Sequence, residues 1–317
     1  MQLNALSRKS TIVSILLLVA ILVAATLRYW FAPFEMEMAV GESRGKFIFV
    51  LLAMVLYFVG ALIQGKMLSR SGLCGGHCAF PMPIYALLTC GIFVAPDILT
   101  VSIASLCFTV ALHLLLRSLH NAEETDSVFF AAVLLGATAL LYPPCVVLFV
   151  AIPIAVFALA LSLRQALLML IGYFIPLFVA SYIVWYGGGG FLDLATKLYE
   201  AISTSTMAAV ERVPYVSIVF ASMALLLIVW GIVYAAIRST KTFTLTRVRR
   251  AFYLFLWVML LSVTTVALPG RDISACAIIA VPATVLLSFS LDVLPPNFAT
   301  ISYWALLVTF AVHLFVA

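Results

Sequence analysis

The sequence TIVSILLLVAILVAATL occupies residues 11–27 and decides the fold class. It holds no Asp, Glu, Lys or Arg, and an α-helix needs about 20 mainly apolar residues to cross the hydrocarbon of a bilayer. Arg8 and Lys9 precede it, as basic residues precede the core of a signal peptide. The run is longer than the roughly 7–15 apolar residues of such a core. We therefore expect a membrane-spanning helix over residues 11–31.

The whole chain repeats this pattern. Its 317 residues are 66% hydrophobic and only 9% charged, whereas soluble proteins carry about 25% charged residues. Segments that cross a bilayer are helices or closed barrels, and the runs here are about twice as long as the roughly 10-residue strands of a barrel. We predict an all-α, polytopic transmembrane helix bundle that forms a single domain, residues 1–317. The predicted spans, about eleven at roughly 20 residues each, are residues 11–31, 47–65, 82–96, 98–116, 127–143, 145–163, 166–186, 215–237, 251–268, 273–291 and 298–317.

The basic residues predict the orientation. Lys and Arg are enriched in cytoplasmic loops, and a cytoplasmic N-terminus places eleven of them inside and six outside. The run that contains Arg247, Arg249 and Arg250 is the strongest anchor. We interpret it as a topology signal and expect no nucleic-acid partner. The C-terminus then lies outside.

The segment after the first span supplies two carboxylates, Glu35 and Glu37, one residue apart at the predicted outer interface. A solvated loop is the ordinary explanation for acidic residues in this position. The functional alternative is a pair that holds a divalent cation or acts as a base toward an acceptor group. Arg28 precedes the pair. It either extends its side chain to the membrane surface or faces the same cavity.

A second outer loop, residues 187–213, begins with four glycines that form a flexible hinge. Apolar residues then recur at helical spacing and polar residues occupy the opposite face. We predict an amphipathic helix over residues 191–204 that lies on the outer membrane surface. Its apolar face comprises Phe191, Leu194, Leu198 and Ile202, and its polar face Asp193, Lys197, Glu200 and Thr204.

A third outer segment contains Arg271, in a short turn between two late spans. This turn is either simply solvated or presents a guanidinium that matches phosphate oxygens in a fork. His113 and His313 lie near the ends of apolar runs, so we expect them at the membrane surface. The segment Cys74–Cys78 offers three ligands where a closed zinc site needs four, and we predict no metal site there.

The run from Ser127 to Phe130 and from Leu135 to Pro144 resembles an uncharacterised multi-pass inner-membrane family of Gram-negative bacteria. Some members of that family have been labelled carotene oxygenases. Such chemistry would need a cluster of histidine ligands, and the chain has none in its motifs. The resemblance covers about residues 80–290 and implies a location in the bacterial inner membrane.

In architecture the chain also resembles the GT-C class of membrane glycosyltransferases, which use polyprenyl-phosphate sugars. The resemblance implies that Glu35 or Glu37 is catalytic and that Arg271 and Arg28 bind the lipid phosphate. It also implies a polyprenyl-phosphate sugar donor as partner and makes a divalent cation a candidate cofactor. The alternative is a non-enzymatic membrane protein, either a subunit of an envelope assembly or a lipid or polymer exporter. Fold analogy alone does not decide between them.

Overall fold

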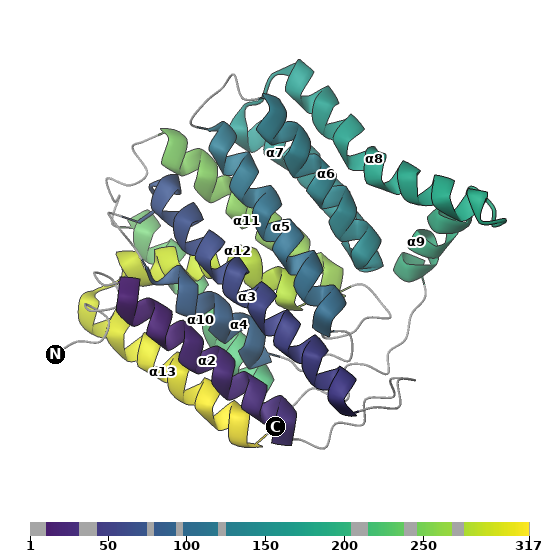
Figure 1. The fold of residues 1–317 in the computed structure, drawn as a ribbon. Helices are drawn as coiled ribbons and strands as arrows, with labels where there is room; N and C mark the ends of the chain where they lie inside the picture. The colour runs from purple at the N-terminus through teal and green to yellow at the C-terminus, as the bar shows by residue number, and fades with distance from the viewer. Residues whose placement is uncertain are drawn as a thin grey trace.

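The computed structural model describes residues 11–31, 43–74, 79–92, 98–119, 125–203, 215–237, 246–267 and 276–316. Every regular element in these ranges is a helix, which confirms the all-α prediction (Figure 1). The elements are α2 (Thr11–Phe31), α3 (Ser43–Ser71), α4 (Pro81–Ile92), α5 (Ile98–Ser118), α6 (Thr125–Leu141), the 3-10 helix η1 (Pro143–Val150), α7 (Ala151–Leu159), α8 (Leu163–Tyr186), α9 (Asp193–Ser203), α10 (Tyr215–Ile237), α11 (Thr246–Ala267), α12 (Cys276–Val293) and α13 (Pro296–Val316).

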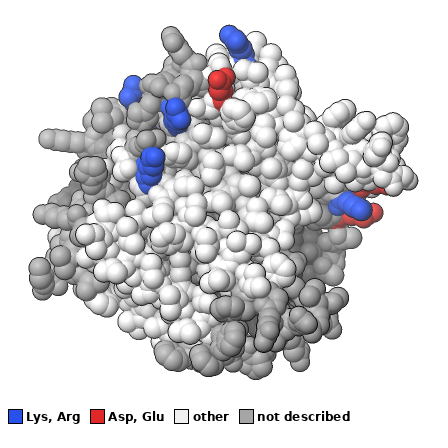
Figure 2. All heavy atoms as spheres, viewed as in Figure 1, with Lys and Arg blue, Asp and Glu red and all other residues white. Residues whose placement is uncertain are grey.

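Eight of the described helices are long and apolar enough to cross a membrane: α2, α3, α5, α8, α10, α11, α12 and α13. Three shorter apolar helices, Pro81–Cys90, Thr125–Leu141 and Pro143–Leu159, coincide with the remaining predicted spans. The charged side chains visible in Figure 2 gather at two separate places, with a wide uncharged surface between them. This arrangement suits a polytopic membrane protein. The exact count of eleven spans and the cytoplasmic N-terminus remain predictions.

Helix α12 forms the centre of the bundle. It packs against α10, α4, α11 and α5 and is almost entirely buried. Two of its hydroxyl groups donate to its own backbone, Thr284 to the Ala280 carbonyl at 2.6 Å and Ser288 to the Thr284 carbonyl at 2.7 Å, whereas Ser290 donates to the Ile228 carbonyl of α10 at 3.3 Å. Such internal bonds satisfy polar groups where no water is at hand.

Glycines allow the closest helix contacts, as is common between helices in membranes. Gly231 of α10 faces Ser290 of α12 so closely that a Cβ at this glycine would collide with the serine. Gly172 of α8 faces α6, where a Cβ would lie 2.8 Å from the Phe129 carbonyl oxygen. Gly136 of α6 faces the Tyr173 carbonyl in the same way. The two glycines bring the axes of α6 and α8 together.

Helix α9 confirms the predicted amphipathic segment in part, because it begins at Asp193 and leaves Phe191 in the preceding turn, and Thr204 lies outside the described residues. The residues before it form a turn, and the Gly190 N–H donates to the Asp193 carboxylate at 2.7 Å. This bond fixes the turn that leads into the helix. Leu194 and Leu198 are half-buried, whereas Asp193, Lys197 and Glu200 are exposed. The helix packs against α8 and η1.

Candidate functional site

The predicted catalytic residues lie outside the described part of the chain. Glu35 and Glu37 belong to residues 32–42, and Arg271 belongs to residues 268–275. Of the four predicted site residues, the structure places only Arg28. It stands in the last turn of α2, and the segment that contains the two glutamates begins four residues later, at residue 32.

Helix α13 contacts both α2, which carries Arg28, and α10. Helices α2 and α13 lie side by side, with their C-terminal ends at the same end of the bundle (Figure 1). The first turns of α10 pack against the last turns of α13, where the Ser217 hydroxyl lies 3.3 Å from Nδ1 of His313. Arg28 is close enough to His313 for electrostatic interaction. We call Arg28, Ser217 and His313 the three-helix cluster.

The three-helix cluster is largely buried, although Arg28 as a whole is only half-buried. Ser217 and His313 are each only 1% exposed, and Nη1 of Arg28 is buried as well. Arg28 and His313 occupy the last turns of their helices, where the partial negative charge of the helix dipole favours cations. The dipoles therefore lower the cost of placing a guanidinium and an imidazole together away from water.

The burial of His313 corrects the expectation that this histidine lies at the membrane surface. Its position near a helix end does suggest exposure, but α10 covers the side of α13 that carries it. A single sequence reveals the position of a residue along its helix and not which distant segment packs there. His113, by comparison, is half-buried in α5.

The second ring nitrogen of His313, Nε2, determines what the three-helix cluster could bind. Nε2 of His313 is buried and has no hydrogen-bond partner among the residues that the structure describes. A buried polar atom in this state costs about 1–3 kcal/mol. When the Ser217 hydroxyl donates to Nδ1, Nε2 carries the proton and becomes a donor. An N–H donor beside a guanidinium is an arrangement that suits an anion.

A metal centre is not visible in the described residues, where no group of three or more His, Cys, Asp or Glu side chains comes together. Of the Cys74–Cys78 segment, residues 75–78 lie outside the description. Whether Glu35 and Glu37 hold a divalent cation therefore stays a prediction.

Comparison with known proteins gives one match. The model of a protein family described as "Family of unknown function (DUF6427)" matches residues 1–317. No curated protein and no solved structure matches the chain. The match agrees with the expected resemblance to an uncharacterised family. The Gram-negative origin and the likeness to glycosyltransferases remain expectations.

Proposed function

The chain belongs to the DUF6427 family, whose function is unknown, and from that premise we propose that it is a GT-C-like glycosyltransferase. In this proposal it resides in the bacterial inner membrane and takes a sugar from a polyprenyl-phosphate donor at the outer face. The buried contact of the Ser217 hydroxyl with Nδ1 of His313, beside Arg28 at the end of α2, carries the proposal. It supports a site for one phosphate at the end of a spanning helix.

The donor chemistry accounts for the cations. A polyprenyl-phosphate sugar presents a phosphodiester at the depth of the lipid headgroups, and this group stays anionic throughout the reaction. The guanidinium of Arg28 and the Nε2–H of His313 would each donate to its oxygens. Arg271 is the predicted second arginine. Charge-assisted bonds of this kind are about twice as strong as neutral ones.

The acceptor chemistry accounts for the carboxylates. An acceptor hydroxyl oxygen attacks the anomeric carbon of the sugar, the bond from that carbon to the phosphate oxygen breaks, and polyprenyl phosphate leaves. The proton of the hydroxyl needs a base, and Glu35 and Glu37 follow Phe31 by four and six residues. One of them would take the proton, or the pair would hold a divalent cation on the phosphate.

The charge pattern of the spans also favours this function over ion-coupled export. In the described helices that are long enough to span, charged side chains stand only within the first or last two turns. Proton-driven transporters place ionisable groups along a path through the membrane. Chemistry at one membrane face needs no such path.

A lipid analysis tests the proposal. Loss of the gene should raise the amount of a polyprenyl-phosphate-linked sugar in lipid extracts, measured by mass spectrometry, because the enzyme that consumes it is gone. The wild-type gene should restore the normal amount, whereas Glu35→Gln together with Glu37→Gln should not. An unchanged pool of these lipids in the deletion strain would favour the non-enzymatic alternative, an assembly subunit or an exporter.

A further inference from the structure

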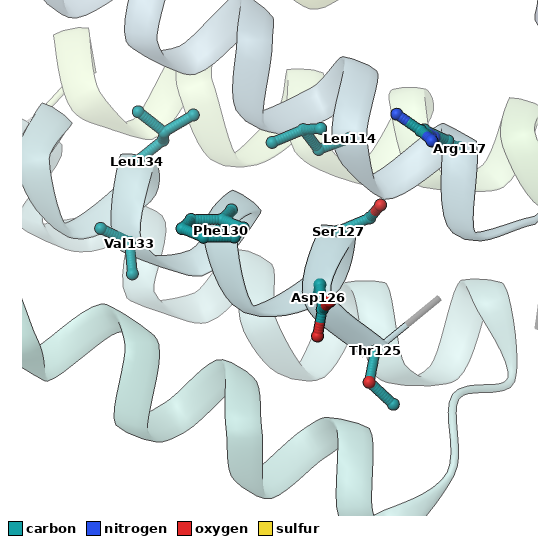
Figure 3. Close-up of a pocket in the computed structure, with 8 residues that line it drawn as sticks. All are labelled: Leu114, Arg117, Thr125, Asp126, Ser127, Phe130, Val133 and Leu134. Atoms are coloured by element: carbon teal, nitrogen blue, oxygen red, sulfur yellow. The ribbon is translucent and has the colours of Figure 1, made fainter. Parts of the chain in front are cut away.

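A groove of about 760 Å³ lies between the C-terminal end of α5 and the N-terminal end of α6 (Figure 3). It is at the opposite end of the bundle from the last turn of α2, which carries Arg28 (Figure 1). Its volume falls within the roughly 300–1,000 Å³ of ordinary ligand sites. Ligand binding in this groove is therefore independent of the proposed enzyme activity.

One end of the groove is charged. Arg117 stands in the last turn of α5 and Asp126 in the first turn of α6, and both side chains are exposed. In Figure 3 the Ser127 hydroxyl points to the side of Arg117, whereas the Asp126 carboxylate points away from it. The groove thus presents a cation and an anion in two separate positions. A ligand that carries both signs of charge is the best electrostatic match for both.

The rest of the groove is apolar and follows the helix axes. Leu114 stands about one turn before Arg117 on α5, and Phe130 and Leu134 follow Asp126 at intervals of four residues on α6. Residues four apart share one helix face. The Phe130 side chain is 57% exposed. From Asp126 to Leu134 this face extends about 12 Å at 1.5 Å per residue.

We propose that this groove binds one phospholipid with a primary-amine headgroup, of the phosphatidylethanolamine type. The headgroup phosphate accepts hydrogen bonds from Arg117, the ammonium donates to Asp126, and an acyl chain covers Phe130 and Leu134. Arg117 ends a membrane-length helix, so its guanidinium lies at the depth of a headgroup. A purely anionic lipid would meet the Asp126 carboxylate, and a trimethylammonium headgroup has no N–H to donate to it.

Native mass spectrometry of the purified full chain in detergent tests this site, with phosphatidylethanolamine, phosphatidylcholine and phosphatidylglycerol as probes at equal concentration. The wild type should retain phosphatidylethanolamine preferentially. Arg117→Ala should weaken that binding about tenfold or more, since a hydrogen bond to a charged group is lost. Asp126→Asn should remove the preference over phosphatidylglycerol. Phe130→Ala should weaken the binding of all three lipids.

The matched controls are Arg164→Ala and Phe157→Ala, which change an exposed arginine and an exposed phenylalanine outside the groove. Both should bind lipid like the wild type. If Arg117→Ala proves unstable, Arg117→Lys replaces it in the test. Lysine keeps the positive charge, so this variant should retain part of the phosphatidylethanolamine binding. Equal retention of the three lipids by the wild type would overturn the proposal. So would unchanged binding by Arg117→Ala and Asp126→Asn, or an equal loss in the controls.

Discussion

The Ser217 hydroxyl lies 3.3 Å from Nδ1 of His313, although 96 residues separate them in the chain. This contact joins the beginning of α10 to the end of α13 inside the bundle. The bond at Nδ1 holds the imidazole in one orientation and leaves Nε2 available for another partner. In functional histidines, a hydrogen bond at one ring nitrogen commonly sets the role of the other in this way. Three segments that are remote in sequence thereby supply one polar cluster.

Replacing Ser217 tests that contact. Ser217→Ala leaves a buried ring nitrogen without its partner, so we expect a loss of about 1–3 kcal/mol in stability. Thermal unfolding of the purified protein in detergent measures it. Ser222→Ala is the matched control, because Ser222 is an exposed serine of the same helix whose hydroxyl donates to the Val219 carbonyl of that helix. Equal unfolding temperatures for the wild type and both variants would mean that the contact does not contribute.

Replacing Arg28 tests the phosphate role. Arg28→Ala should raise the polyprenyl-phosphate sugar pool toward that of the deletion strain, and Arg28→Lys should lie between the two. Lysine keeps the charge but lacks the planar fork that matches phosphate. Arg164→Ala, at the other end of the bundle, should behave as the wild type. A wild-type lipid pool in Arg28→Ala, with normal amounts of protein in the membrane, would remove Arg28 from the site.

Adding a side-chain atom at the contact between α6 and α8 should destabilise the protein. Gly172→Ala places a Cβ 2.8 Å from the Phe129 carbonyl oxygen, and backbone on both sides has to move. Overpacking of this kind costs about 1–3 kcal/mol, which a lower unfolding temperature in detergent would reveal. Gly187→Ala is the control, since its nearest atoms lie 3.5 Å away. If the two variants unfold alike, the close packing of these helices is not needed for stability.

Cysteine labelling tests the orientation. In a cysteine-free background, Glu200→Cys on α9 and Arg249→Cys on α11 each introduce an exposed thiol. A membrane-impermeant maleimide added to intact cells, with the outer membrane permeabilised, should label position 200 and spare position 249. Arg249 belongs to the basic run that resists translocation. The opposite labelling would reverse the topology and move the three-helix cluster to the cytoplasmic face.

The sequence predicted well those features that depend on apolar length and helical spacing within one segment. Residues 11–27 form a spanning-length helix because the backbone bonds within the segment and every side chain suits hydrocarbon. Leu194 and Leu198 face the protein because their helical spacing separates them from Asp193 and Lys197. These features depend on neighbours within a few residues, so an isolated sequence contains them. The start of α9 differed by two residues because Phe191 and Leu192 belong to a turn, closed by the bond between Gly190 and Asp193, that periodicity does not register.

The candidate site depended on contacts that no local pattern contains. Arg28 was found from its place beside an acidic segment, but His313 was expected at the surface and Ser217 drew no attention. Both belong to apolar runs in which a single polar residue has no periodic signal. Their burial follows from the meeting of α10 with α13. The roles of Glu35, Glu37 and Arg271 remain predictions, because these residues lie outside the described ranges.

By itself, the sequence determined that this chain is an all-α membrane protein, where most of its helices lie and which face of α9 is polar. Apolar length and helical period suffice for those properties, since a bilayer imposes them on each segment separately. Only the tertiary structure decided that the last turn of α2, the beginning of α10 and the last turn of α13 share one buried site. Helix packing within a bilayer depends on shape and on a few polar contacts. Such complementarity exists only between surfaces that the fold has already brought together.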